Sequence, residues 1–343
     1  MVGVDVGIWS TKVVELQRRG GTYELKKVYM FPTDRSIFAE KGREIQKEMF
    51  VHFLKYTVRR CKLRFKKITI SLNNENCIVK YTRIHQTPED QMENLCWRAI
   101  EGNVPFNKQE TNIDCKITDI NEETKDMGVV VVAAKKDLIE NLMDVFKKAG
   151  VKLAIIDADD LALYNIWEAN YALESEKNVL IVDIGAKLTK MSIIIDAKPC
   201  FGKMFYIGGC DVTDAIQKGM GVEEAEAERM KIKLAEDLPV ERKEEISNIS
   251  REKMDSLFKE IKSSADLFYR KEGEEFPPIE KVFLCGGSSE LPFLKDVAKQ
   301  YFNVSSVEKF NPFDVFVVKK GSLEYIEKKA ASFAIAAGLA LRQ

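Results

Sequence analysis

The sequence has no excess of charge of either sign. Its 53 lysine and arginine residues stand against 54 aspartate and glutamate residues, so the formal net charge is -1. Nucleic acids and anionic membrane surfaces attract proteins through clustered positive charge. We therefore expect neither nucleic acid nor a lipid surface to be a main partner.

Histidine is scarce, and the cysteines are not grouped. Only His52 and His85 are present. The seven cysteines include no C-x-x-C pair and are Cys61, Cys77, Cys96, Cys115, Cys200, Cys210 and Cys285. Zinc sites need closely spaced cysteine and histidine ligands. The pattern argues against a zinc site and favours reduced thiols used as small apolar side chains.

Long apolar runs are also missing. No run approaches the roughly 20 residues that span a bilayer, and the longest candidate, residues 330–341, predicts a buried helix rich in small residues. The chain opens with the strand-like run Val2–Val6 and not with a signal peptide. We expect a cytoplasmic protein without direct membrane insertion, so that any association with a membrane would come through a partner.

The sequence does contain an internal repeat. Hydrophobic residues make up 45% of 343 residues, enough for two domains. Val4-Asp5-Val6-Gly7 recurs as Val182-Asp183-Ile184-Gly185, each time between two predicted strands. The repeat predicts two similar lobes.

Periodicity and turn residues also predict the individual elements. The predicted strands are 2–6, 11–17, 23–30, 67–72, 128–134, 153–157, 178–183, 190–195 and 281–284. The predicted helices are 45–61, 88–102, 136–149, 291–301 and 330–341, and a turn is predicted at 73–76.

The repeated turn carries residues that suit phosphate binding. Glycine lets backbone N–H groups approach phosphate oxygens, and hydroxyls or lysines add donors. The first hairpin offers Asp5, Gly7, Ser10 and Lys12, and the second offers Asp183, Gly185, Lys187 and Thr189. One Asp-x-Gly alone is commonly only turn geometry. The matched pair predicts that both lobes hold a nucleotide tail, with Asp5 and Asp183 binding Mg²⁺ through water.

A third glycine turn supports this prediction. Gly286, Gly287 and Ser288 follow a predicted strand and precede a predicted helix. Glycines there allow an adenosine to lie against the backbone, with amides at the helix start directed at phosphate. No G-x-x-x-x-G-K-[ST] motif occurs, so the chain is not a P-loop protein.

Taken together, these motifs resemble the superfamily of actin, heat-shock chaperones and sugar kinases. More narrowly, the chain is similar to the PilM family, the FtsA-like proteins of type IV pilus assembly. The segments that carry the resemblance are 3–16, 97–106, 181–189, 207–216, 284–294 and 333–342. The resemblance implies ATP as ligand and an α/β, actin-like (ribonuclease H-like) two-lobed fold with an FtsA-type inserted subdomain.

The resemblance also implies domain boundaries. The first lobe would comprise 1–80 with 152–177 and 312–343, and the inserted subdomain 81–151. The second lobe would comprise 178–225 with 265–311, carrying a helical subdomain at 226–264.

Further site residues follow only from the resemblance. It implies that Gly208 and Gly209 face the phosphates and that Glu228 and Lys231 reach ribose or base. On spacing alone, Glu228 and Lys231 would be a solvated helix face.

The sequence departs at two places from the pattern of active actin-like ATPases, and these departures predict slow hydrolysis of ATP. Ile8 and Trp9 stand where small or hydroxyl residues are usual, and residues 157–163 contain no glutamine to position water. Asp157 and Asp159 are the candidates for binding metal or water there. We expect ATP binding with at most slow hydrolysis.

The implied partner is the N-terminal cytoplasmic peptide of a PilN-like inner-membrane protein, held in a groove between the inserted subdomain and the lobe with residues 1–80. Other pilus assembly components and self-association stay open. Apolar residues of the insertion are predicted to be mostly core: Trp97, Ile100, Val104, Pro105 and Phe106.

Two other functions within the superfamily are alternatives. A small-molecule kinase would need a catalytic aspartate and a sugar pocket in the first lobe, and the sequence offers neither clearly. An FtsA-like filament protein would usually carry a C-terminal amphipathic helix, where this sequence has Leu341-Arg342-Gln343.

Overall fold

The computed structural model describes eight stretches of the chain, which are residues 1–38, 46–72, 77–104, 107–171, 178–234, 240–272, 277–318 and 328–342. The chain divides into two compact units. Unit 1 is Met1–Asn170 with Phe313–Gly321 and Ile335–Gln343, and unit 2 is Tyr171–Pro312 with Ser322–Ala334.

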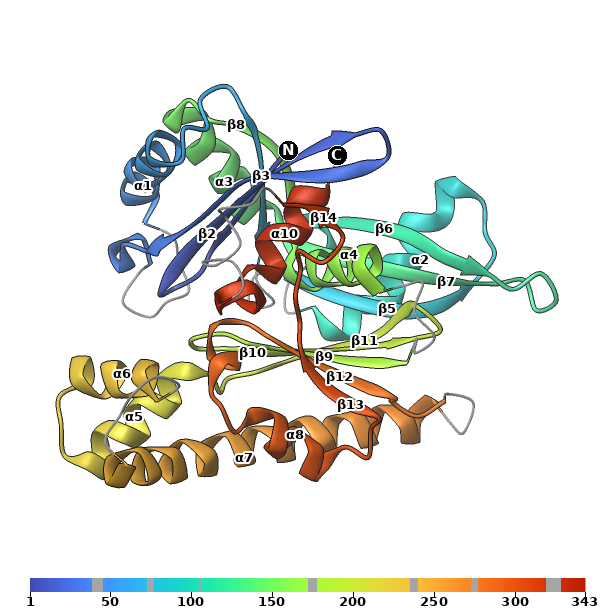
Figure 1. Ribbon diagram of the computed structural model, residues 1–343. Helices are drawn as coiled ribbons and strands as arrows, with labels where there is room; N and C mark the ends of the chain where they lie inside the picture. Colours follow the sequence, from blue (N-terminus) through green and yellow to red (C-terminus); the bar gives the residue numbers. More distant parts are fainter. Residues whose placement is uncertain are drawn as a thin grey trace. The chain divides into compact units, whose positions relative to one another are not determined.

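Unit 1 is built on a six-stranded sheet (Figure 1). Its strand order is β14 (Phe316–Val317), β3 (Thr22–Pro32), β2 (Ser10–Arg19), β1 (Val2–Val6), β4 (Lys67–Leu72) and β8 (Lys152–Ala158). The first hairpin, β1–β2, is antiparallel, whereas β1, β4 and β8 run parallel to one another. Residues that follow these three strands therefore lie at one edge of the sheet, where open α/β sheets bind ligands.

Helices cover both faces of this sheet. On one face, α1 (Lys47–Arg60) and α3 (Lys136–Ala149) share a buried cluster with Val2, Val4 and Ile68. On the other, α10 (Ala334–Leu341) lies so close that a Cβ on Gly3 would stand 2.1 Å from the Ala336 carbonyl oxygen. A Cβ on Gly338 would similarly meet α4 (Asp159–Tyr171), 1.9 Å from the Ala162 carbonyl oxygen. These contacts require glycine.

A smaller antiparallel sheet is inserted between β4 and α3. Its order is β5 (Cys77–His85), β7 (Asp126–Lys135) and β6 (Thr111–Ile120). One face is covered by α2 (Glu89–Ile100), whose Cys96 and Ile100 are fully buried against β7. Short 3-10 turns lie at Arg35–Ile37 (η1), Glu101–Asn103 (η2) and Lys108–Glu110 (η3).

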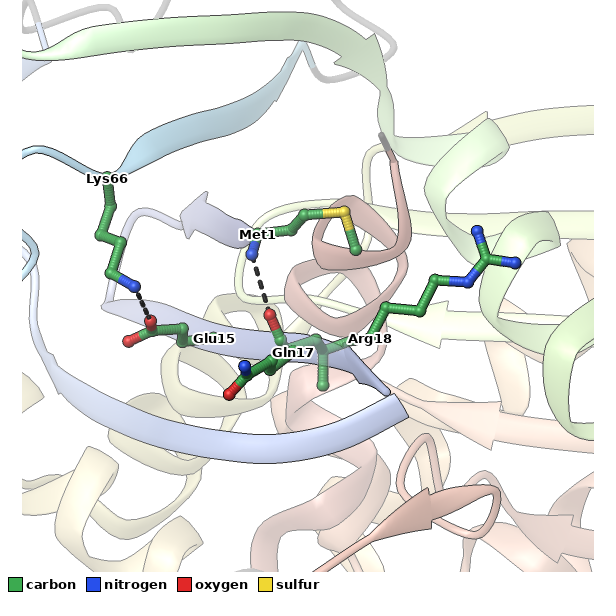
Figure 2. A pocket seen from close by; sticks show the side chains of 6 residues that line it. Met1, Glu15, Gln17, Arg18 and Lys66 are labelled. Atoms are coloured by element: carbon green, nitrogen blue, oxygen red, sulfur yellow. Dashed lines mark hydrogen bonds and ion pairs between the residues drawn. The ribbon is translucent and has the colours of Figure 1, made fainter. Parts of the chain in front are cut away.

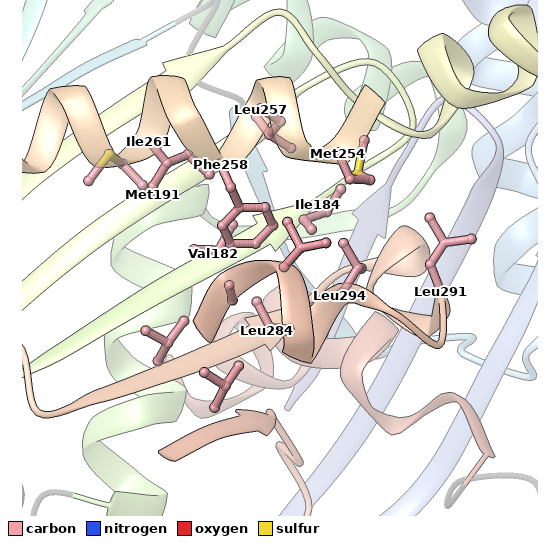
Figure 3. Close-up of a cluster of buried hydrophobic side chains, with 14 of the residues drawn as sticks. Val182, Ile184, Met191, Met254, Leu257, Phe258, Ile261, Leu284, Leu291 and Leu294 are labelled. Carbon is pink, nitrogen blue, oxygen red and sulfur yellow. The ribbon is translucent and has the colours of Figure 1, made fainter. Parts of the chain in front are cut away.

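Unit 2 carries a five-stranded sheet. Its order is β11 (Lys198–Phe205), β10 (Thr189–Ile195), β9 (Val179–Ile184), β12 (Lys281–Cys285) and β13 (Ser306–Lys309). One face packs against α7 (Val240–Glu272) and α8 (Leu294–Tyr301), with Val182, Ile184 and Phe258 in the shared core (Figure 3). Two further helices, α5 (Gly209–Met220) and α6 (Glu224–Lys233), pack beside α7. Since Val182 and Ile184 point into this core, Asp183 lies on the opposite face of β9.

Most predicted elements are confirmed. The predicted helix 88–102 is Glu89–Ile100, helix 291–301 is shortened to α8 after the 3-10 turn η4 (Gly287–Glu290), and helix 330–341 begins with the 3-10 turn η5 (Ala330–Phe333). Strands β5, β6, β11, β13 and β14 were not predicted. The predicted turn at 73–76 lies outside the described residues. Among the described helices, none combines the length and apolar character needed to cross a bilayer.

Candidate nucleotide-binding site

The second Asp-x-Gly segment forms a tight turn that receives the start of α5. The Gly185 N–H donates to the Leu188 carbonyl at 2.9 Å and closes the turn. The Gly209 and Cys210 N–H groups donate to the Gly185 and Ala186 carbonyls at 2.9 and 2.7 Å. The beginning of α5 is therefore fixed directly on the turn.

This docking leaves no room for side chains on Gly208 or Gly209. A Cβ on Gly208 would lie 2.6 Å from the Ala186 carbonyl oxygen, and a Cβ on Gly209 would lie 2.3 Å from Ser288 Oγ. Ser288 Oγ also donates to the Gly185 carbonyl at 3.3 Å. Three segments far apart in the sequence thus meet at the predicted glycines, which is the geometry that lets backbone approach a phosphate closely.

Glu228 and Lys231 lie against the same turn. Lys231 Nζ donates to the Gly209 carbonyl (2.9 Å), to Thr213 Oγ1 (2.9 Å) and to Glu228 Oε2 (2.7 Å). The two charged side chains are only 15% and 11% exposed. They are therefore not the solvated helix face that spacing alone would indicate. Their predicted contact with ribose or base stays a prediction, and Thr213, which links them, was missed.

The third glycine turn meets the end of β9. Gly286 has a φ of +84°, and a Cβ there would lie 2.5 Å from Asp183 Oδ1. Its N–H donates to the Ala331 carbonyl at 3.0 Å. Gly287 is exposed, with open space around its Cβ position. Gly286 and Ser288 thus belong to the assembled turns, and Gly287 lies at their outer edge.

Asp183 is enclosed by partners from its own unit. It is 6% exposed, and the buried Lys190 places Nζ 3.6 Å from its Oδ2. The Cys285 thiol also hydrogen-bonds Asp183, and burial raises the pKa of that thiol well above its ordinary value, so it is a neutral donor. Lys190 was missed, although it follows Asp183 by seven residues, as Lys12 follows Asp5.

The other two residues predicted on this hairpin lie apart from one another. Thr189 is fully buried and its Oγ1 donates to the Ile207 carbonyl at 2.7 Å. Lys187 is exposed at the turn. Thr189 therefore supports the segment that leads to Gly208, whereas Lys187 faces solvent.

In unit 1 the first hairpin brings Asp5, Gly7 and Lys12 together. Lys12 Nζ lies 3.0 Å from Asp5 Oδ2, and a Cβ on Gly7 would stand 3.2 Å from the same Nζ. Ser10 begins β2 beside them and is half-buried. Trp9 carries the Arg35 guanidinium over its ring at 4.2 Å. This bulky pair occupies the position where the hydrolytic pattern has small residues.

The ends of β4 and β8 add a polar cluster in unit 1. Ser71 lies opposite Asp157 in the β4–β8 register, and Ser71 Oγ donates to Asp159. Arg342 Nε lies 3.0 Å from Asp157 Oδ2. Burial raises the pKa of Asp157, and Arg342 opposes that rise. Ser71 and Arg342 were missed, because their roles depend on contacts between distant segments.

The carboxylates offer a poor fit to a metal ion held by the protein itself. Within the described stretches no group of three or more His, Cys, Asp or Glu side chains could hold a metal. Asp5 is paired with Lys12, and Asp183 with Lys190. Mg²⁺ prefers several oxygen ligands, many of them water and phosphate. A divalent ion at these turns would therefore need phosphate oxygens of the nucleotide among its ligands.

Two surface hollows lie away from these turns. One, of about 280 Å³, is lined by Met1, Glu15, Leu16, Gln17, Arg18 and Lys66. In it Lys66 Nζ pairs with Glu15 Oε1 at 2.8 Å, and the Met1 amino group donates to the Leu16 carbonyl at 2.8 Å (Figure 2). The other, of about 440 Å³, is lined by residues 85–88 and Lys125. Neither hollow shares a residue with the glycine turns.

Matching Asp-x-Gly hairpins on two mixed sheets define the class: this is an actin-like fold. Similar solved structures agree. A chain titled "PilM-PilN type IV pilus biogenesis complex" has a TM-score of 0.85 at 24% identity, covering 99% of this chain and 97% of that one. Ethanolamine utilization protein EutJ from Carboxydothermus hydrogenoformans has a TM-score of 0.53 at 12% identity, covering 99% and 88%. MreB5 of Spiroplasma citri, bound to AMPPNP, has a TM-score of 0.50 at 13% identity, covering 98% and 93%.

A comparison with protein families places the chain more narrowly than its fold does. The family model described as type IV pilus assembly protein PilM matches residues 3–343. The chain belongs to this family, and the predicted fold and family are confirmed.

Proposed function

We propose that this chain binds ATP at the glycine turns and works as a scaffold of type IV pilus assembly. In this role it holds the N-terminal cytoplasmic peptide of a PilN-like inner-membrane protein. It is cytoplasmic and reaches the inner membrane through that partner. Mg²⁺ accompanies the nucleotide, carried by its phosphates, and turnover is at most slow.

One observation carries the nucleotide part of the proposal. The turns at Gly185, Gly208–Gly209 and Gly286 are packed so closely that a Cβ at each position would come within 3 Å of another atom. Such crowding of backbone, next to a half-buried lysine and the N-terminus of a twelve-residue helix, suits an anionic ligand. The similarity to an actin-like protein solved with AMPPNP supports the same ligand class.

Slow turnover has its own support in unit 1. Hydrolysis needs a group that can orient or deprotonate water. Asp159 accepts a hydrogen bond from Ser71, and Asp157 is paired with Arg342. Both candidate acids are thus engaged, and we expect turnover far below the enzyme median of roughly 10 s⁻¹.

The inserted sheet supports the partner part of the proposal. The face of β5 and β7 that α2 does not cover carries Val79, Tyr81, Val130 and Val132. Tyr81 and Val130 lie opposite one another, and Val79, Tyr81 and Val132 are half-buried. Val79 and Val132 also pack against the cluster that α1 and α3 share, so Tyr81 is the side chain of this face that we expect an extended peptide to contact. Trp97 packs with Ile100 and Val104 on the α2 side, as core, whereas Pro105 and Phe106 lie outside the described residues.

ATP binding is tested with Lys231→Met, measured by calorimetry against the wild-type chain. Loss of a charge-assisted contact at the turns is expected to weaken ATP binding at least about tenfold. Lys233→Met is the matched control, because Lys233 is exposed on the same helix. Equal ATP affinity in all three proteins would remove Lys231 from the site, and no measurable binding by the wild type would refute the nucleotide proposal.

A further inference from the structure

Each of the two hairpins carries a lysine directly across from its aspartate. The spacing Asp-x-Gly-x-x-x-x-Lys occurs as Asp5–Lys12 and again as Asp183–Lys190. In the β1–β2 register Asp5 lies opposite Lys12, and in the β9–β10 register Asp183 lies opposite Lys190. The internal repeat therefore includes a fixed cation beside each carboxylate.

Lys190 is the more deeply placed of the two lysines. Its side chain is 9% exposed, and its Nζ lies 3.6 Å from Asp183 Oδ2. A buried ammonium group is costly unless it is paired, and burying the pair is itself a weak source of stability. The pair is thus better explained by what it offers to a ligand than by its contribution to folding.

The location of the pair links it to the ligand site. Asp183 is the next-to-last residue of β9, directly before the turn that receives α5, and a Cβ on Gly286 would touch its carboxylate. Lys190 follows the same turn on β10. The two charges therefore lie at the base of the crowded glycine turns.

The same contacts oppose direct metal binding by Asp183. One of its oxygens faces the Lys190 ammonium group, and the carboxylate also accepts from the Cys285 thiol. A divalent cation in contact with this carboxylate would have to displace Lys190 or lie beside a like charge in a buried setting. Both are unfavourable, because like charges repel strongly where water is excluded.

We propose that Lys190 provides, beside the nucleotide phosphates, the positive charge that a divalent cation would otherwise supply at the second hairpin. A phosphate oxygen beside Asp183 would give the Lys190 ammonium group, which has three donors, a second anionic acceptor. ATP binding by this chain is therefore largely independent of Mg²⁺. This inference rests on the proposed ATP binding and adds to it a phosphate-binding residue and a change in the metal requirement.

The test is a titration of the full chain with a fluorescent ATP analogue, once with MgCl₂ and once with EDTA. For the wild type we expect the two dissociation constants to agree within about threefold. For Lys190→Met we expect binding in EDTA to weaken at least about tenfold, with MgCl₂ restoring most of the loss. Lys198→Met is the matched control, since Lys198 is exposed in the same sheet and pairs with Ile195 at the far end of β10, and it should behave as the wild type. Lys190→Arg keeps the charge and should also do so.

The outcomes separate this inference from the function on which it rests. Wild-type binding that is strong in MgCl₂ and lost in EDTA would overturn the inference and leave ATP binding standing, as would a Lys190→Met protein that binds equally well in EDTA. A wild type that binds in neither condition would refute both. Should Lys190→Met fail to fold, the double change Asp183→Asn/Lys190→Met removes both charges of the pair, and the same loss in EDTA is expected. Unchanged EDTA binding in that double variant would contradict the proposal.

Discussion

Gly286 and Gly287 are adjacent in the sequence but have different roles. Gly286 adopts a φ of +84°, and a Cβ there would lie 2.5 Å from Asp183 Oδ1 and from the Ile184 carbonyl oxygen. Gly287 has no atom within 4 Å of its Cβ position. Only the first position requires glycine, because side chains are strained at such a φ and collide there.

We predict that Gly286→Ala lowers the free energy of unfolding by about 1–3 kcal/mol, the cost of a strained residue, and weakens ATP binding. Gly287→Ala should change the free energy of unfolding by less than about 0.5 kcal/mol, as for most surface changes. Urea denaturation of both variants checks this. Equal destabilisation by the two substitutions would show that the turn does not have the described conformation.

The ion pair of Asp157 and Arg342 predicts a pH dependence. Burial raises the pKa of Asp157 in the folded state, so keeping it charged costs stability above that pKa. This cost disappears as the pH falls through the folded pKa towards the unfolded value of roughly 3.9. Arg342 reduces the cost while Asp157 is charged.

Arg342→Gln should therefore destabilise the chain at neutral pH, by about 1 kcal/mol because the guanidinium is 37% exposed and partly screened. The effect should shrink as the pH is lowered towards 4. Thermal melts across this range measure it. The control is the same Arg342→Gln comparison made in an Asp157→Asn background. There Arg342 faces no ionisable partner at position 157, so the substitution should cause no pH-dependent change in thermal stability. A pH-independent effect of Arg342→Gln would contradict the pairing.

Site residues that belong to a local turn could be predicted from the sequence, whereas site residues that depend on contacts between distant segments could not. Gly185 and Gly286 stand in recognisable turn patterns, whereas Gly208 and Gly209 were implied only by the resemblance, and all four meet in the assembled turns. Lys190 could have been found from its spacing to Asp183, because a hairpin places such residues opposite each other. Ser71 and Arg342 could not, since they meet Asp159 and Asp157 only after the chain folds.

The inserted sheet shows where element prediction fails. Strand β7 is a continuous apolar run and was predicted, whereas β5 and β6 lie at the two edges and carry charged residues between the apolar ones. Edge strands commonly keep such charges, which weakens their periodic signal. The predicted end of the insertion at residue 151 stays a prediction. That boundary would include α3 in the insertion, whereas α3 shares its buried cluster with α1 on the six-stranded sheet.

A substitution on the face of this sheet opposite α2 should change the affinity for the peptide partner. Tyr81→Ala should weaken binding of a PilN-type N-terminal peptide at least about tenfold, as aromatic anchors of interfaces do. Tyr56→Ala on α1 is the control, since Tyr56 is also an accessible tyrosine of unit 1 but lies outside the inserted sheet. Fluorescence anisotropy of a labelled peptide measures both. A loss caused by Tyr56→Ala and not by Tyr81→Ala would move the peptide site to α1.

In the whole molecule, we propose a nucleotide site in unit 2 and a peptide site in unit 1. The fold and the family were predicted from motifs that extend along the whole sequence, and both are confirmed. We further predict that ATP binding changes the affinity of the chain for the peptide. This coupling requires that ATP binds two states of the chain with different affinity.

A titration of the wild-type chain with a labelled PilN-type peptide, with and without saturating ATP, tests the scaffold function and its regulation together. We expect specific binding in both conditions and a shift in affinity of about fivefold or more with ATP, the lower range of allosteric coupling. A scrambled peptide should not bind. Absence of specific peptide binding in both conditions would contradict the scaffold function, and identical affinities would contradict its regulation by nucleotide.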